Sequence, residues 1–303
     1  MPLRQTLLYL SRHAGLRRWA ETSAAAARLS ARFVAGNSLE QALDVCRRIH
    51  GEGIQVTLDY LGENVKSMAE AAACRDMYLR MLHALRDAGV DSYVSLKLTQ
   101  FGLDLSAEGC AENVGRLVER AAAIGAFVRI DMESSAYTDR TLELVRSLHR
   151  RWPACGTVMQ AYLRRCAADV EALIAEGVPI RLCKGAYLES SDVAFPAKAD
   201  VDRNYFALAC RLLESGVRTA IATHDEAMIG RIEGFAAGRG IGKDRFEFQM
   251  LYGIRRDLQK RLVADGYRLR LYVPFGEAWY PYFMRRLAER PANVLFIVRN
   301  LFR

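Results

Sequence analysis

Several features that define common protein classes are missing from this sequence of 303 residues. The longest strongly apolar run is VLFIV at 294–298, far short of the roughly 20 residues that a membrane-spanning helix needs. There is no GxxxxGK[ST] phosphate loop and no GxSxG nucleophile elbow. Proline is scarce, and no Pro-rich or low-complexity linker divides the chain. The sequence thus gives no sign of a P-loop site or a serine hydrolase, and one large domain can account for its length.

Cysteine usage and charge narrow the possibilities further. The seven cysteines are scattered without a CxxC pair, which predicts buried free thiols in a reducing compartment and no metal site. The formal net charge is +8, but the basic residues are spread along the chain. A dispersed excess without an aromatic-rich basic stripe favours small anionic ligands or a membrane surface over nucleic acid.

The first 35 residues are basic and contain a single acid, Glu21. This composition suits a mitochondrial transit peptide, and it also suits a basic amphipathic helix that packs on the protein or touches lipid. We prefer the helix because apolar residues such as Leu7, Leu16 and Phe33 persist at helical intervals.

From Asn37 onward, short apolar runs alternate with helical patterns at a spacing of about 30 residues. The runs lie at 54–60, 92–98, 126–132, 157–163, 179–184, 217–223, 245–251 and 269–275. Several helical patterns end on a glycine, the residue favoured just past a helix: Gly89, Gly125, Gly177, Gly216 and Gly266. Eight strands alternating with eight helices predict an α/β protein with a (β/α)8 barrel over residues 51–303, preceded by a helical arm over residues 1–50.

Every predicted strand ends in polar or charged residues, and in such a barrel the strand ends form the ligand-binding mouth. These residues are Tyr60, Glu63, Lys97, Asp131, Glu133, Gln160, Arg181, Lys184, Thr223, His224, Asp225, Gln249 and Tyr272. Each could be structural on its own, but together they predict a large charged site. Lys97, Asp131 and Glu133 form either a general acid/base set or a buried ion pair.

Two strand ends carry local sequence patterns of interest. RLCKGAY at 181–187 joins two cations to a Gly-Ala turn that lets a ligand approach the backbone, although a solvated turn explains it equally. In THDE at 223–226, Thr223 or Asp225 could cap the next helix, whose N-terminus could also bind a pyrophosphate. His224 has no second His or Cys at ligand spacing, so we do not predict a metal there.

GRGIGK at 238–243 has the glycines of a dinucleotide loop, but it follows a helix and precedes a strand. A dinucleotide fingerprint needs the reverse order, so we interpret this segment as a connection at the opposite face of the barrel.

The stretch YVPFGEAWYPYFMRRLAERPAN at 272–293 predicts a strand, a break at Gly276 and a helix that begins near Glu277. Adjacent arginines Arg285 and Arg286 could together grip one carboxylate if this helix lies over a pocket. They could also belong to an ordinary solvated face, with Arg285 and Glu289 as an i,i+4 pair.

Nine segments in order resemble the monofunctional bacterial proline dehydrogenases, over roughly Asn37 to Arg299. They are LGENV, SLKLTQFG, RIDMESS, QAY, RLCKGAYLE, ATHDE, FEFQMLYG, YVPFG and WYPYFMRRLAERPAN. The resemblance implies non-covalent FAD at the strand ends, with Arg181 near the flavin N5 edge. The implied flavin-binding residues are Gln160, Arg181, Cys183, Lys184, Gly185, Ala186, Tyr187, Thr223, His224, Asp225 and Gln249. The family often has Asn at the position of Asp225, so that contact departs from the pattern.

The same resemblance implies the substrate site. Lys97, Arg285 and Arg286 would clamp the proline carboxylate. Tyr272 and Tyr282 would pack on the pyrrolidine ring, and Asp131 would organise the site. Glu63 would pair with Arg285 to close a lid, and Glu289 would face the flavin. A small residue at the position of Tyr272 is typical of the related enzymes that oxidise hydroxyproline.

The implied reaction is hydride transfer from proline C5 to flavin N5, which yields Δ1-pyrroline-5-carboxylate. Electrons would pass to a membrane quinone, and the product to a separate pyrroline-5-carboxylate dehydrogenase. Such a protein would be cytoplasmic, with peripheral contact to the inner face of the membrane. The alternatives are another flavin barrel of the folate-reductase type and a non-catalytic basic binding protein.

Overall fold

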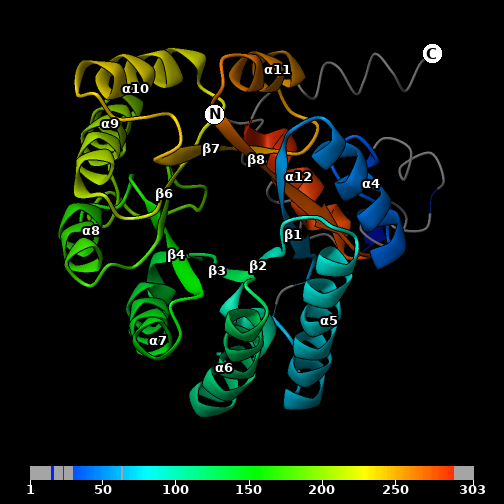
Figure 1. Ribbon diagram of the computed structural model, residues 1–303. Helices are drawn as coiled ribbons and strands as arrows, with labels where there is room; N and C mark the ends of the chain where they lie inside the picture. Colours follow the sequence, from blue (N-terminus) through cyan, green and yellow to red (C-terminus); the bar gives the residue numbers. More distant parts are fainter. Residues whose placement is uncertain (1–14, 17–22, 24–29, 63, 290–303) are drawn as a thin grey trace.

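The computed structural model describes residues 15–16, 23, 30–62 and 64–289, with side chains up to Met284, and shows a closed barrel of parallel strands (Figure 1). The strands are β1 (Gln55–Tyr60), β2 (Tyr93–Leu96), β3 (Phe127–Ile130), β4 (Cys155–Gln160), β5 (Ile180–Cys183), β6 (Thr219–Ala222), β7 (Phe246–Leu251) and β8 (Arg268–Phe275). Neighbours in the sequence are neighbours in the sheet, and β8 closes on β1 with Gln55 opposite Arg270. The predicted (β/α)8 fold is confirmed.

Helices surround the barrel and connect its strands (Figure 1). They are α4 (Leu39–Gly51), α5 (Met68–Asp87), α6 (Ala107–Ala123), α7 (Thr138–Arg151), α8 (Cys166–Ala175), α9 (Lys198–Ser215), α10 (Glu226–Gly238), α11 (Arg256–Ala264) and α12 (Trp279–Glu289), with 3-10 turns at Leu98–Phe101 and Ser135–Tyr137. Ser67 and Ser106 accept backbone hydrogen bonds as N-caps of α5 and α6. The predicted glycine stops are confirmed, because all five adopt positive φ at or just past a helix end. GRGIGK joins the end of α10 to β7, as expected of a connection at the amino-terminal face.

Several predicted strand boundaries differ from the observed ones by one to three residues, and β2 and β3 end at Leu96 and Ile130 instead of 98 and 132. β4 ends at Gln160 instead of 163, because Leu163 pairs with Ala194 outside the barrel and Tyr162 donates its backbone N–H to the Lys184 carbonyl. The last helix begins at Trp279, close to the predicted start near Glu277.

Helices α4 and α12 pack against different parts of the barrel. α4 buries Ala42, Cys46 and Ile49 and packs on β1 and β8, where it covers the outer face of the closing strands. α12 instead packs through Trp279 and Phe283 in a second apolar cluster with segments near the strand ends. The helix after β8 therefore lies toward the mouth of the barrel. Most of the predicted basic N-terminal helix lies outside the described residues.

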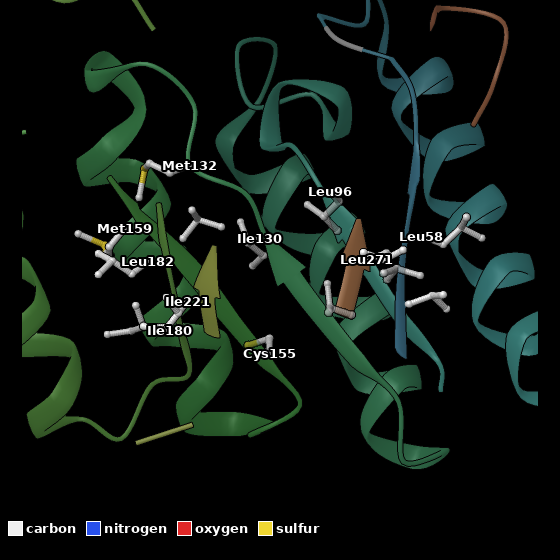
Figure 2. Packing of buried hydrophobic residues seen from close by; sticks show 14 of the residues in the cluster. Leu58, Leu96, Ile130, Met132, Cys155, Met159, Ile180, Leu182, Ile221 and Leu271 are labelled. Carbon is white, nitrogen blue, oxygen red and sulfur yellow. The ribbon is translucent and has the colours of Figure 1, made fainter. Parts of the chain in front are cut away.

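Side chains alternate between the barrel interior and the helices, as strand geometry requires. Outward-facing aliphatic residues such as Leu58, Leu96 and Ile130 join the main hydrophobic cluster between strands and helices (Figure 2). Inside the amino-terminal end, the fully buried Arg270 donates from Nε to Glu247 Oε1 at 3.0 Å and lies over the ring of Tyr93. These buried polar side chains fill the interior of the barrel at its amino-terminal end, whereas the carboxyl end contains a cavity.

All seven cysteines are free thiols, of which Cys46, Cys110, Cys155 and Cys166 are buried and the other three are partly exposed. The prediction of free thiols is confirmed, and the prediction that the cysteines are buried is confirmed for Cys46, Cys110, Cys155 and Cys166. No helix in the described part of the chain is long and apolar enough to cross a membrane.

Candidate functional site

A cavity of about 720 Å³ opens at the carboxyl ends of the strands, where the fold predicts a ligand site. Its wall includes all eleven residues predicted to bind flavin, from Gln160 to Gln249. Four residues predicted for the substrate site, Lys97, Asp131, Tyr272 and Tyr282, line the same cavity. One continuous space thus adjoins both predicted sites.

One end of the cavity is built around Asp131. Its Oδ1 accepts a hydrogen bond from Arg181 Nη1 at 2.9 Å, and Ser95 Oγ lies 3.2 Å from the same oxygen. Arg181 also donates from Nη2 to Ser95 Oγ at 2.9 Å, and its guanidinium lies 5.5 Å from the ring centre of Tyr272. Burial and the charges of Asp131 and Asp59 hold the pKa of Tyr272 well above its ordinary value, so its hydroxyl keeps its proton.

Asp59 is a member of this cluster that the sequence analysis missed. It is fully buried, and its Oδ2 lies 3.5 Å from Lys97 Nζ and 2.7 Å from the Tyr272 hydroxyl. Burial raises the pKa of Asp59, the Lys97 charge opposes that shift, and the Asp131 charge adds to it. Lys97 and Asp131 therefore do not pair with each other but with Asp59 and Arg181 respectively.

Glu133 and Tyr60 do not reach the cavity, contrary to the expectation that all strand-end residues face the mouth. Glu133 accepts hydrogen bonds from the Thr99 backbone N–H at 3.1 Å and its hydroxyl at 2.7 Å. Tyr60 faces outward and packs on Phe275. Glu133 thus lies apart from Lys97 and Asp131 in the cavity wall, and the ion pairs of Lys97 and Asp131 are made with Asp59 and Arg181, not within the predicted set.

The other end of the cavity carries a linked set of charges. Lys184 Nζ lies 2.5 Å from Asp202 Oδ1 and 2.8 Å from Asp225 Oδ2. Asp225 is the N-cap of α10, because its Oδ1 accepts from the Met228 backbone N–H at 3.2 Å. The capping prediction for Asp225 is thus confirmed, and the N-terminus of α10 faces this end of the cavity.

His224 Nε2 accepts the backbone N–H of Leu251 at 2.9 Å, so that nitrogen is unprotonated and the imidazole spans β6 and β7. This contact gives a structural reason for the histidine in THDE. No group of three or more His, Cys, Asp or Glu side chains able to hold a metal occurs among the residues that the structure describes.

The donors present suit a large anionic cofactor. Within the described chain, Arg181 Nε is buried and lacks a hydrogen-bond partner, although both other nitrogens of that guanidinium are paired. A buried N–H on a cavity wall needs an acceptor, and a bound ligand can supply one. At the far end the N-terminus of α10 suits a phosphate, and the ammonium groups of Lys184 and Lys198 lie there in ion pairs with Asp202 and Asp225.

The remaining predicted residues fall at the limit of the described structure. Glu63 lies outside the described residues, as do the side chains of Arg285, Arg286 and Glu289. Arg285, Arg286 and Glu289 belong to α12, the helix that also carries Tyr282 of the cavity wall.

The fold and the site define a (β/α)8-barrel enzyme with one cavity that joins a carboxylate–guanidinium cluster to the N-terminus of α10. Residues 42–299 match the proline dehydrogenase family. The chain is 44% identical to proline dehydrogenase of Deinococcus radiodurans over 91% of this chain and 90% of that protein, and 39% identical to proline dehydrogenase 2 of Bacillus subtilis over 99% of each.

A solved structure of proline utilization A from Bdellovibrio bacteriovorus, inactivated by N-propargylglycine, superimposes with a TM-score of 0.80 at 29% identity. The match covers 86% of this chain and 32% of that larger protein. The chain therefore belongs to the proline dehydrogenase family, the oxidoreductases of proline catabolism.

Proposed function

We propose that this protein oxidises L-proline to Δ1-pyrroline-5-carboxylate with FAD bound in the cavity at the strand ends. The family assignment supports the substrate, and the single observation that supports the cofactor is the wall of the cavity itself. It joins the unpartnered Nε–H of Arg181 to the end that holds Lys184 and the N-terminus of α10 in one space. The chemistry that FAD supplies there is acceptance, at its N5, of the hydride that leaves C5 of proline.

Arg181 is the residue we assign to the flavin ring, because a fixed buried cation favours negative charge on a neighbouring ring. Its own charge is balanced by Asp131 at 2.9 Å, which also holds its orientation. Lys184, Thr223 and the α10 N-terminus would hold the phosphates. The roles of Gln160, Cys183, Gly185, Ala186, Tyr187, His224 and Gln249 as further contacts rest on their places in the cavity wall.

The substrate end lacks enough positive charge from the described residues to bind a carboxylate. Lys97 and Arg181 are matched by Asp59 and Asp131, so those four groups are neutral together. The positions of Arg285 and Arg286, one turn from Tyr282, supply the missing cations in our proposal. Tyr272 and Tyr282 would then pack on the pyrrolidine ring. Positioning of this kind can lower the activation barrier by roughly several kcal/mol.

The electron acceptor in this proposal is a membrane quinone, and the product passes to a separate pyrroline-5-carboxylate dehydrogenase. The net charge of +8 suits transient contact with the anionic inner face of a membrane by a cytoplasmic protein. Glu63 and Arg285 would form the gate over the substrate, and Glu289 would face the flavin.

The visible absorption spectrum of the purified protein tests the function. A flavin spectrum that proline alone bleaches supports the proposal, and reoxidation by a short-chain quinone but not by NAD⁺ supports the acceptor. Bleaching by NADH but not by proline would favour a folate-reductase type of enzyme. A protein that neither contains nor binds flavin would contradict the cofactor assignment.

The gate has its own test in stopped-flow reoxidation of the proline-reduced enzyme. Glu63→Ala should weaken proline binding and speed reoxidation by oxygen, because a lid held by one pair opens when that pair is lost. Equal oxygen reactivity and equal proline affinity in the unaltered protein and Glu63→Ala would contradict the proposed gate.

A further inference from the structure

Asp59 lies behind the substrate end of the cavity without touching it. The residue is 0% exposed and is absent from the cavity wall, whereas its neighbours Lys97 and Tyr272 both line that wall. Whatever Asp59 does for a ligand, it must do through these two side chains.

The Asp59 carboxylate is also contacted on the side that faces away from the cavity. Tyr78 of α5 is fully buried, and its hydroxyl lies 3.1 Å from Asp59 Oδ1 and 2.8 Å from the Ser95 carbonyl oxygen. This contact leaves Oδ2 for the two cavity residues, at 2.7 Å from the Tyr272 hydroxyl and 3.5 Å from Lys97 Nζ. One oxygen thus fixes two groups that come from opposite sides of β1.

The Tyr272 hydroxyl also lies 3.1 Å from Asp131 Oδ2, and it has only one proton to donate. The shorter distance favours donation to Asp59. The ionisable groups that face Asp59 are Tyr78 from α5, Lys97 after β2, Asp131 after β3 and Tyr272 from β8. Lys97 is the one cation in this set, so the ion pair depends on the charge of Asp59.

We propose that Asp59 is a positioning residue for the substrate: it fixes the Lys97 ammonium and the Tyr272 hydroxyl in the cavity and thereby sets the affinity for a small cyclic amino acid. The inference rests on the function proposed above. A buried ion pair with a purely structural role would contribute to stability alone. The contacts of Asp59 with two cavity-lining groups predict an effect on substrate binding beyond any effect on folding.

The test is Asp59→Asn, which preserves the size of the side chain and its contact with Tyr272 but removes the charge that holds Lys97. In flavin-loaded enzyme, we expect kcat/KM for proline to fall by about ten- to a hundredfold, mostly through KM. Binding of a five-membered ring carboxylate without the ring nitrogen, measured by calorimetry, should weaken in parallel. The matched control is Glu133→Gln, a buried acid outside the cavity, which should leave both quantities within about twofold.

A double-mutant cycle with Lys97→Met separates positioning from a general structural effect. If Asp59 acts through Lys97, adding Asp59→Asn to Lys97→Met should change KM much less than it does in the original enzyme. Equal KM and ligand affinity in the original protein and Asp59→Asn would overturn the inference while proline oxidation stands. Absence of proline oxidation in the original protein would instead overturn the proposed function.

Discussion

The Lys184 ammonium nitrogen lies 2.8 Å from Asp225 Oδ2, so an acid partly neutralises the cation that we assign to the cofactor phosphates. Asp225→Asn should remove one of the two carboxylates that contact Lys184, leaving Asp202 at 2.5 Å, while Asn still caps α10. We expect FAD to bind more tightly by up to about fivefold, the ratio that corresponds to 1 kcal/mol for a partly exposed pair. Flavin titration of the apoprotein measures this change. Weaker binding in the variant would show that Asp225 itself contacts the cofactor.

The same pair makes a prediction for pH. Burial acts to raise the pKa of Asp225, but the hydrogen bonds from Lys184 and the Met228 backbone N–H, together with the charges of Lys184 and Lys198, outweigh it, and the pKa lies below the ordinary 3.8. A carboxyl whose pKa is lowered by folding stabilises the protein above the unfolded value and loses that contribution as pH falls through the folded value. The difference in unfolding free energy between the protein and Asp225→Asn should therefore shrink below about pH 3.8.

Arg286 follows Tyr282, a residue of the cavity wall, by four residues in α12. Arg286→Lys should raise KM for proline by about tenfold or more with normal flavin content, because lysine keeps the charge but loses the planar fork. Steady-state kinetics with a flavin assay checks this prediction. The control is Arg116→Lys on the exposed face of α6. An unaltered KM in Arg286→Lys would remove Arg286 from the clamp.

Tyr272 lines the cavity with its hydroxyl fixed by Asp59, so it fills space beside the proposed ring position. We expect the protein to discriminate strongly against hydroxyproline, whose extra hydroxyl has no room there. Tyr272→Ser should reduce the preference for proline over hydroxyproline, because the smaller side chain leaves more room in the cavity. The ratio of kcat/KM for the two amino acids measures the change. Comparable rates of oxidation of both by the unaltered protein would contradict this interpretation of the cavity.

The barrel could be predicted from the sequence because strand and helix patterns alternate regularly, and all eight strands form where apolar runs occur. Most cavity residues could be predicted for the same reason, since they follow those runs. Asp59 could not be predicted as a site residue from the end of the strand, because the last residue of β1 is Tyr60 and adjacent residues face opposite sides of the sheet.

The pairing of charges could not be predicted from strand order alone. Lys97 faces Asp59 because β2 lies beside β1, whereas Asp131 is reached by Arg181 across the barrel interior. Contacts between Tyr272 and Asp59 require the closure of β8 on β1. Such contacts depend on which alternate face each residue adopts, and one residue of error at a strand end reverses that face.

Glu247 and Arg270 form the most buried ion pair at the opposite end of the barrel, with Arg270 Nε 3.0 Å from Glu247 Oε1. Burial acts to raise the pKa of Glu247, but the charges of Arg270 and Arg129 and the hydrogen bonds from Arg270 and Gln249 together outweigh it, and the pKa lies below the ordinary 4.5. Glu247→Gln leaves the fully buried guanidinium with the exposed Asp91 carboxylate, 3.7 Å away, as its remaining acidic partner among the described residues, and we expect a loss of about 3–5 kcal/mol in unfolding free energy at neutral pH. Glu119→Gln on an exposed position of α6 should cost less than about 0.5 kcal/mol.

The loss of unfolding free energy in Glu247→Gln should become smaller as the pH falls. Because folding lowers the pKa of Glu247, its contribution is complete above 4.5 and disappears as pH falls through the folded value. Denaturant unfolding of Glu247→Gln and the unaltered protein should therefore converge in acid. Replacing both partners, as Glu247→Gln with Arg270→Met, should recover part of the loss at neutral pH, since no unpaired charge remains buried. A double variant less stable than Glu247→Gln alone would mean that the contacts of Arg270 with Gln55 and the Val56 carbonyl oxygen hold this end of the barrel independently of Glu247.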